Sequence, residues 1–207
     1  ALPGWTDDDV VGSPYAVYAY NLEPSLGKPE ELAQLKRKLN QHGIALILDF
    51  VSNHLAIDHP WTISHPDWFV QGKKEDVYAH PDWFFATGQG GYIAHGKDPN
   101  FPPWTDTAQL NFFSHALRQA LSDELRRIAE VSDGVRCDMA MLLLNDVFQE
   151  VWGEIIRDYH RPETEFWAEA IRCLKNQRPG FLFLGEVYWG FERQLQQLGF
   201  DFTYDKT

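Results

Sequence analysis

The stretch GVRCDMA at residues 134–140 has the composition of a short buried strand, yet it carries two charged side chains. Arg136 and Asp138 are two residues apart, which places them on the same face of a strand. Burying a charge costs free energy unless the charge is paired or hydrogen-bonded. Polar groups at the end of an apolar strand are typical of the ligand-binding edge of a parallel α/β sheet. The stretch therefore predicts a site at the carboxyl end of a strand.

The segments around this strand alternate between helical and extended patterns. Helices are predicted at 29–42, 114–130, about 146–177 and 191–198, and strands at 44–50, 134–139, 181–189 and 200–205. A helix followed by a strand, repeated along the chain, is typical of βα units and a parallel sheet. We therefore expect an α/β fold.

A long irregular insert, residues 52–110, interrupts this alternation and is rich in Trp, His, Pro, Asp and Gly. The motif HPDWF occurs in it twice, at 65–69 and 80–84. Two copies of five residues do not make a repeat architecture, so they predict the same turn used twice. A loop of this length in a compact domain is usually functional or forms a small subdomain.

Charged groups recur at the predicted strand ends: Asp49 ends the first strand, Arg136 and Asp138 the second, and Glu186 the third. Two carboxyl groups, one ionised and one protonated, are the minimum for hydrolysing a glycosidic bond. Arg136 is expected to keep Asp138 ionised, and the apolar neighbours of Glu186 are suited to raising its pKa. On spacing alone, a simple Arg–Asp ion pair is the commoner explanation.

Composition narrows the choice of partners and compartment. The formal net charge of -12 disfavours nucleic acid and anionic membranes as partners. The two cysteines, Cys137 and Cys173, exclude a disulfide framework and lack metal-type spacing. No apolar run is long enough to span a membrane and no signal peptide opens the chain. We expect a cytoplasmic protein, with secretion as the alternative, and the oligomeric state stays open.

Three of these segments together resemble a known family. DFVSNH (49–54), GVRCDMA (134–140) and GEVYW (185–189), in this order, are similar to the first three signatures of the α-amylase superfamily, glycoside hydrolase family 13. DTAQLNF (106–112) resembles the stretch after that family's inserted domain B, and GSPYAVYAY (12–20) resembles a tyrosine-bearing barrel loop. The resemblance covers essentially the whole chain.

The resemblance implies a (β/α)₈ barrel, of which strands three to six would be present. Residues 1–51 and 111–207 would be barrel parts, and 52–110 would be a domain-B-like insert. A complete barrel needs about 250 residues. The family's fourth signature, a His-Asp pair with the third essential carboxylate, does not occur before Thr207. The 207-residue chain is therefore expected to be a partial barrel, and whether it is active by itself stays open.

The resemblance also assigns roles in a retaining glycosidase acting on the α-glucosidic bonds of α-glucans or maltooligosaccharides. Asp138 would be the nucleophile that forms a glycosyl-enzyme intermediate, and Glu186 would be the general acid/base. Arg136 would orient Asp138 and keep it ionised. These three residues are the predicted catalytic group.

The predicted substrate-binding group surrounds these residues. His54 would hydrogen-bond the sugar, and Tyr15 would stack on its ring. Asp49 would brace the network, and Tyr188 is assigned to the same group. No cofactor is required by the resemblance, but Asn53 matches a position that binds calcium in many members. A loop-stabilising amide is an equally good explanation for Asn53.

Departures from the family pattern leave two alternatives open. The segment 139–142 (MAML) follows Asp138 where starch-degrading members often carry a lysine or histidine, which disfavours a plain endo-amylase. Ala19 also stands where relatives often have aspartate. A transglycosylase could use the same intermediate, with a sugar hydroxyl in place of water. A non-catalytic carbohydrate-binding protein with an amylase-like fold is the other alternative.

Overall fold

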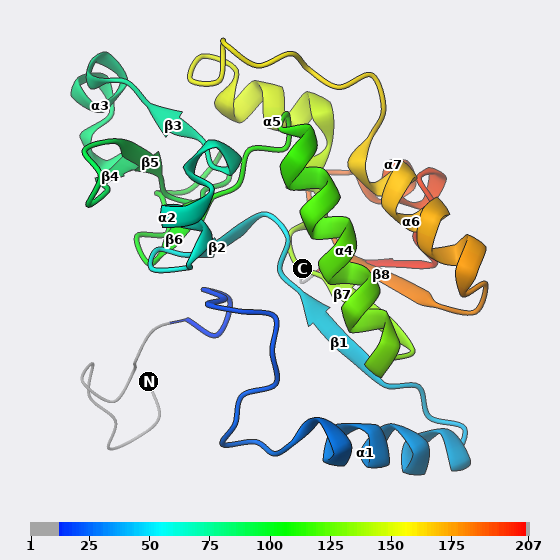
Figure 1. Ribbon diagram of the computed structural model, residues 1–207. Coiled ribbons are helices and arrows are strands. Elements are labelled where there is room, and N and C mark those ends of the chain that lie inside the picture. The colour runs from blue at the N-terminus through cyan, green and yellow to red at the C-terminus, as the bar shows by residue number, and fades with distance from the viewer. Residues whose placement is uncertain (1–12, 206–207) are drawn as a thin grey trace, which may run out of the picture.

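The computed structural model describes residues 13–205, so residues 1–12 and 206–207 of the expected barrel parts lie outside it. Its centre is a four-stranded parallel sheet in the order β1-β7-β8-β9 (Figure 1). The strands are β1 (Ile47–Phe50), β7 (Gly134–Cys137), β8 (Leu182–Glu186) and β9 (Phe202–Tyr204). Successive strands are joined through helices, as the alternating pattern predicted. The parallel α/β sheet is therefore confirmed.

The helices are α1 (Pro29–Gln41), α4 (His115–Val131), α5 (Asn145–Trp152), α6 (Phe166–Gln177) and α7 (Glu192–Gln197). Helix α4 begins where the Ser114 hydroxyl accepts a hydrogen bond from the Leu117 amide, which satisfies one free amide of the first turn. Leu117, Leu121 and Leu125 recur at helical spacing and are all buried. This apolar face holds α4 against the sheet.

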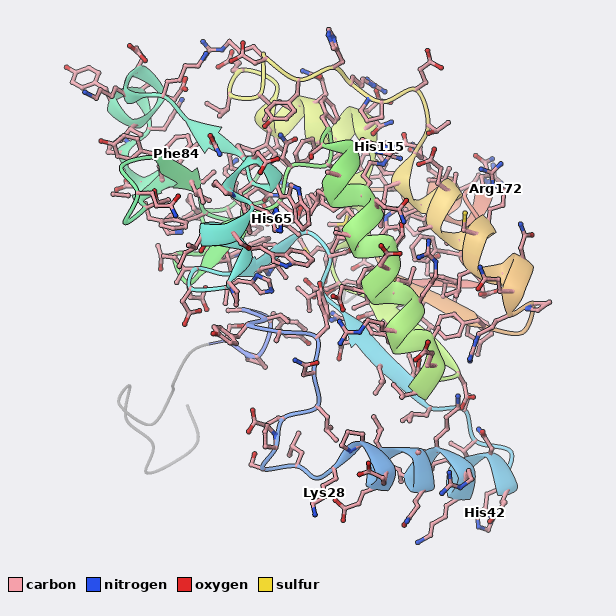
Figure 2. All side chains as sticks on the ribbon, viewed as in Figure 1. Lys28, His42, His65, Phe84, His115 and Arg172 are labelled. Atoms are coloured by element: carbon pink, nitrogen blue, oxygen red, sulfur yellow. The ribbon has the colours of Figure 1, made fainter. Side chains whose placement is uncertain are left out.

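Helix α1 differs from α4 although both have an apolar stripe. No residue of α1 is buried, and Leu35 remains 47% exposed. Figure 2 shows α1, between Lys28 and His42, at the edge of the molecule, where Lys36 and Asn40 bind Asp133 ahead of β7. The strand predicted at 44–50 is also shorter and less buried than its apolar composition predicted. Ile44 is exposed, and β1 begins only at Ile47.

The predicted helix over about 146–177 is wrong in its middle. The structure has two helices, α5 and α6, separated by the loop 153–165. Pro162 lacks an amide hydrogen and interrupts the helical ladder. Hydrogen bonds hold the loop in place, because the Glu165 carboxylate accepts from the Asn145 amide at 2.9 Å and Arg118 donates to the Thr164 carbonyl at 2.8 Å.

The predicted strand 181–189 is shorter than expected and ends at Glu186. Trp189 and Gly190 have φ of 63° and 83°, which turns the chain out of the extended conformation. A positive φ is rare for a bulky residue and is found mainly in turns and strained functional segments. The turn places Glu186 at the last position of β8.

The insert forms two small antiparallel sheets beyond the end to which β1 points (Figure 1). One pairs β2 (His54–Ala56) with β6 (Thr107–Gln109), and the other has the order β3-β5-β4. The remaining elements are β3 (Gln71–Gly72), β4 (Phe84–Ala86), β5 (Tyr92–Ala94), α2 (Trp61–Ser64), η2 (Pro66–Trp68), α3 (Lys74–Ala79), η3 (Pro81–Trp83) and η4 (Ala140–Leu143), the last following β7 outside the insert. The domain boundaries themselves stay predictions.

Both copies of HPDWF form the same turn, as their repetition predicted. Each folds into a single 3₁₀ turn over its Pro-Asp-Trp residues. In each, the histidine ring stacks on the tryptophan, with 4.0 Å between ring centroids for His65–Trp68 and for His80–Trp83. These aromatic pairs form part of the insert's own packing.

Candidate active site

Five polar side chains gather at the carboxyl ends of the four parallel strands. Asp49 lies near the end of β1, Arg136 in β7, Asp138 directly after β7, and Glu186 and Tyr204 end β8 and β9. Asp49 is the register partner of Arg136, and Glu186 is the register partner of Tyr204. Because parallel strands end at one rim, the strand order brings these residues together. The predicted convergence of Asp49, Arg136, Asp138 and Glu186 is confirmed.

Arg136 is the centre of this group, which we call the rim network. One terminal guanidinium nitrogen donates to Asp49 Oδ1 at 2.8 Å and to Asp138 Oδ1 at 3.0 Å. The other donates to Glu186 Oε2, and Nε donates to the Tyr204 hydroxyl at 2.8 Å. The charge of Arg136 is therefore paired, which is the condition for burying it on a strand.

Asp138 does not have the ionisation state that its arginine neighbour predicted. Burial and the nearby negative charge of Glu186 together raise the pKa of the Asp138 carboxyl to about 7, against the opposing effect of Arg136. The expectation that Arg136 alone keeps Asp138 ionised is therefore wrong. Three carboxyl groups share a single guanidinium, so one positive charge cannot neutralise all of them.

Glu186 is 1% exposed and is held from several sides. Its Oε1 accepts from the Tyr188 hydroxyl at 2.7 Å, and its Oε2 accepts from the Met139 amide at 3.3 Å. The left-handed backbone of Met139, with φ 45°, turns the chain directly after Asp138. The Asp138 and Glu186 carboxyls are neighbours, because both accept from Arg136 and the charge of Glu186 raises the pKa of Asp138. Two neighbouring carboxyls lose their protons in coupled steps, so one of them stays protonated to a higher pH than a free carboxyl.

His54 and Tyr15 lie beside the rim network. Burial lowers the pKa of His54 to about 4, so its imidazole is neutral at physiological pH, and it hydrogen-bonds the backbone of Tyr15. The Tyr15 ring lies over the Arg136 guanidinium, 5.1 Å from the ring centroid, and is 39% exposed. A neutral imidazole can donate and accept hydrogen bonds, and an exposed phenol ring can pack on a sugar. Their predicted binding roles stay predictions.

Asn53 is used within the protein. Its Oδ1 accepts from Gln109 Nε2 at 3.1 Å, and its Nδ2 donates to Gln109 Oε1 at 3.3 Å. Calcium in proteins takes six to eight oxygen ligands, with carboxylates prominent among them. Across residues 13–205, no group of three or more His, Cys, Asp or Glu side chains is placed to hold a metal. The Asn53–Gln109 pair matches the loop-stabilising alternative, and the calcium-binding role of Asn53 stays a prediction.

Tyr204 is the member of the rim network that the sequence prediction missed. It stands at the end of a predicted strand, as Asp49 and Glu186 do, and that position was the available signal. Tyr188 was assigned to substrate binding, but its hydroxyl contacts Glu186 directly. Tyr20 was also not singled out, although its buried hydroxyl donates to the Val51 carbonyl next to β1.

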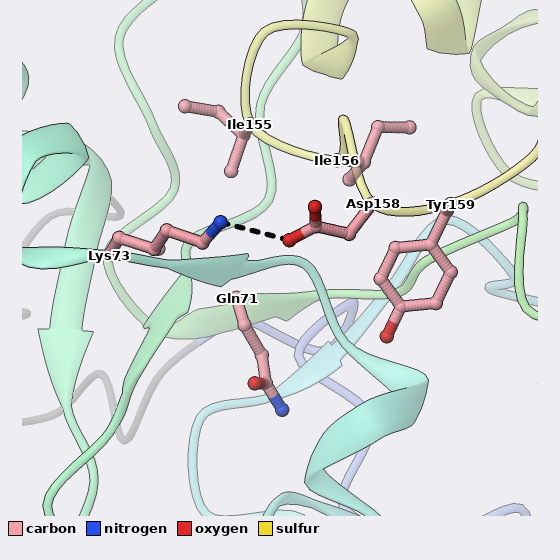
Figure 3. Close-up of a pocket in the computed structure, with 7 residues that line it drawn as sticks. Gln71, Lys73, Ile155, Ile156, Asp158 and Tyr159 are labelled. Carbon is pink, nitrogen blue, oxygen red and sulfur yellow. Dashed lines mark hydrogen bonds and ion pairs between the residues drawn. The ribbon is translucent and has the colours of Figure 1, made fainter.

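A cavity of about 310 Å³ lies elsewhere, between β3 and the loop after α5. Lys73 and Asp158 form an ion pair of 2.9 Å at its wall, and Ile155, Ile156 and Tyr159 line it (Figure 3). None of the predicted catalytic or substrate-binding residues lines this cavity. The chemistry of the rim network is therefore separate from it. No helix in the described part of the chain has the length and apolar character needed to cross a membrane.

Comparisons with known proteins agree with the strand-end signatures. The protein-family model described as "Alpha amylase, catalytic domain" matches residues 13–204 of this chain. An alpha-1,4-glucan:maltose-1-phosphate maltosyltransferase from Pseudomonas aeruginosa is 24% identical over 200 residues, which cover 93% of this chain and 25% of that protein. Alpha-amylase 3 from Dictyoglomus thermophilum is 25% identical over 183 residues, which cover 82% of this chain and 32% of that protein.

The fold agrees as well. The crystal structure of an alpha-amylase from Lactobacillus plantarum superposes with a TM-score of 0.62 and 26% identity, covering 92% of this chain and 36% of that one. The chain thus spans 25% and 32% of the length of these two curated relatives. The four parallel strands correspond to part of a (β/α)₈ barrel. The chain therefore belongs to the alpha-amylase family.

Proposed function

We propose that the rim network cleaves α-glucosidic bonds of α-glucans or maltooligosaccharides with retention of configuration. One observation carries the proposal: a single guanidinium, that of Arg136, binds both the Asp138 and the Glu186 carboxyl. A retaining glycosidase needs one ionised and one protonated carboxyl in close proximity. Inverting pairs are about 6.5–9.5 Å apart to admit a water molecule, whereas retaining pairs are closer, so two carboxyls bound by one guanidinium favour retention.

The proposed reaction starts from the state of the coupled pair in which Asp138 is ionised and Glu186 carries the proton. Asp138 then attacks the anomeric carbon while Glu186 gives its proton to the leaving glycosidic oxygen. The product of this step is a glycosyl ester on Asp138. Glu186, now ionised, removes a proton from the incoming water, whose oxygen displaces Asp138 from the anomeric carbon. The Tyr188 hydroxyl and the Met139 amide support this role, because they stabilise the ionised form of Glu186.

The transfer reaction is a second candidate. The relatives include maltosyltransferases as well as an alpha-amylase, and both kinds of enzyme are named for α-glucan chemistry. In this chain, the residues Ala140, Met141 and Leu142 that follow the nucleophile are buried. They therefore present no charged group to the acceptor side. A sugar hydroxyl would then take the place of water in the second step.

Trapping the intermediate tests the proposal. The protein is incubated with 5-fluoro-α-glucosyl fluoride, whose ester turns over slowly, and its peptides are analysed by mass spectrometry. We expect the glycosyl group on Asp138, and no label in Asp138→Asn. Glu163→Gln, which changes an exposed carboxylate outside the rim network, serves as the control and should label normally. A label on another residue would contradict the assignment of the nucleophile.

Product analysis separates the two reactions. With maltooligosaccharides as substrate, hydrolysis releases reducing ends, whereas transfer leaves their number constant and produces longer chains. Retention is read from the anomeric proton signals of the first product formed. A first product of inverted configuration would exclude the double displacement.

A further inference from the structure

Tyr204 occupies a position that none of the proposed catalytic steps uses. Its backbone is fixed beside the acid/base, because Tyr204 is the register partner of Glu186 and its carbonyl accepts from the Val187 amide at 3.0 Å. Its hydroxyl accepts the Nε–H of Arg136 at 2.8 Å. The tyrosine therefore reaches from the end of β9, across β8, to the arginine of β7.

The hydrogen bond from Arg136 to Tyr204 restricts the orientation of the guanidinium group. It is planar, and its N–H donors point in fixed directions. When the Nε–H is held by Tyr204, the two terminal nitrogens face Asp138 and Glu186, one nitrogen to each carboxyl. The Tyr15 ring covers one face of the same plane. Without the tyrosine hydroxyl, the guanidinium could tilt and lose the arrangement that binds both carboxyls together.

We propose that Tyr204 is a positioning residue of the active site, whose hydroxyl fixes the guanidinium plane of Arg136 and thereby the relative placement of the Asp138 and Glu186 carboxyls. The proposal rests on the proposed function of these two carboxyls. Tyr204 itself takes no proton and touches no reacting atom in the proposed steps. Its effect passes through Arg136.

The positioning role has a measurable electrostatic consequence. Besides Asp138, these titratable groups lie next to Arg136: Asp49 of β1, Glu186 of β8, Tyr204 of β9, and Tyr15 of the loop before α1. Cys137 of β7 and Tyr20 of the same loop lie near Asp138, and Tyr188 binds Glu186. Arg136 is the group that favours ionisation of Asp138, because Glu186 and burial oppose it. A displaced guanidinium should therefore raise the pKa of Asp138 further.

The test is an NMR experiment on the ligand-free chain, which needs no activity. The Nε–H signal of Arg136 is assigned by its loss in Arg136→Lys. In Tyr204→Phe we expect hydrogen exchange of this signal to accelerate about tenfold or more, because the hydrogen bond to the phenol is lost. We also expect the ¹³C titration of the Asp138 carboxyl to move upward by about half a pH unit or more. Tyr18→Phe, which changes a 57% exposed tyrosine, should leave both signals unchanged.

Unchanged Nε–H exchange and an unchanged Asp138 midpoint in Tyr204→Phe would overturn the proposal, even if the melting temperature fell. If Tyr204→Phe does not fold, the hydrogen-exchange rate of the Arg136 Nε–H in the native chain tests the proposal instead. An exchange rate as fast as that of exposed arginines would also overturn the proposal. In an active preparation, Tyr204→Phe should lower kcat about tenfold with little change in KM. The acid limb of its pH profile should move to higher pH. An inactive native protein would contradict the proposed function, but would leave the NMR result on Tyr204 to be judged separately.

Discussion

A half-buried cation at the barrel rim and a buried cation in the insert have different kinds of partner. Arg136, at the rim, is paired with Asp49, Asp138 and Glu186. Lys97, in the insert, is 7% exposed, and its ammonium lies 4.4 Å from the Trp83 ring centroid, with a second indole from α5 at 5.6 Å.

This difference in partners suggests a proposed catalytic role for the cluster at the rim and a structural role for the cluster in the insert. At the rim, burial forces several acids around one arginine and raises the pKa of Asp138 to about 7, which costs stability when the pH is higher. In the insert, aromatic rings surround the lysine, and the same packing joins the insert to α5. A cluster that costs stability is retained where it performs chemistry. Substitutions in the two regions should therefore have opposite effects on activity and stability.

The largest effect is expected from Asp138→Asn. Activity should fall by about 10³-fold or more, because the nucleophile is lost. Stability should change in the other direction. Between about pH 4 and pH 7, the unfolded chain releases the Asp138 proton while the folded protein keeps it, so the native protein loses stability as the pH rises through this window.

The asparagine has no proton to lose. At pH 8 the Asp138→Asn variant should be more stable than the native protein by a few kcal/mol, and at pH 4 the two should be nearly equal. Urea unfolding at both pH values measures the difference. If Asp138→Asn were equally destabilised at pH 4 and pH 8, the raised pKa of Asp138 would not reduce the stability of the native protein, and the difference between the rim and the insert would be contradicted.

Arg136→Lys should have the next largest effect. Lysine keeps the positive charge but lacks the planar fork that binds three carboxyls and a phenol at once. We expect kcat to fall about 10²-fold, with the acid limb of the pH profile moved to higher pH. Arg157→Lys is the matched control, since Arg157 forms a single ion pair with Asp76 outside the rim network. Equal losses in both variants would mean that the fork geometry is unimportant at the rim.

Trp83→Ala tests the insert side of the comparison. The substitution removes the ring on which His80 stacks and over which Lys97 lies, so stability should fall by about 2–3 kcal/mol. Activity per folded molecule should change less than threefold. Thermal unfolding and kinetics on the same preparation measure both effects. Retained stability with lost activity would place the Lys97 region in the catalytic apparatus.

Lys97→Met is expected to have the smallest effect. An apolar side chain of similar size can replace a buried cation at little cost, so stability should stay within about 1 kcal/mol of the native value. The same exchange at the rim, Arg136→Met, should leave buried carboxyls unpaired and lower stability above pH 7. The pair of denaturation curves compares the two regions directly. Equal losses for both methionine variants would remove the distinction.

Local patterns were sufficient to predict the strand-end group but not its protonation. The apolar runs ending in Asp49 and Glu186 and the charged pair in GVRCDMA predicted one rim, and the structure has it. Whether Asp138 is ionised depends on its burial and on the charge of Glu186, which lies 48 residues later in the sequence. Such a balance is set by the folded neighbourhood, so the arginine beside Asp138 predicted the wrong direction.

Long-range contacts explain the other differences. The hydrogen bond between Arg136 and Tyr204 joins residues 68 positions apart, and a tyrosine at a strand end carries no distinctive local signal. The break between α5 and α6 is fixed by Arg118 and Asn145, which bind the loop 153–165 from outside it. Pro162 was a local signal against one continuous helix, but the position of the loop depends on these tertiary contacts.

The most direct test of the central claim is the rate of sugar release from maltooligosaccharides by the native protein and by Glu186→Gln, with Glu163→Gln as the matched control. We predict that Glu186→Gln loses about 10²–10⁴-fold in rate, because glutamine cannot donate a proton to the leaving oxygen, while the control retains the native rate. Equal rates in all three proteins would contradict the assignment of Glu186 as the acid/base and, with it, the proposed chemistry of the rim network.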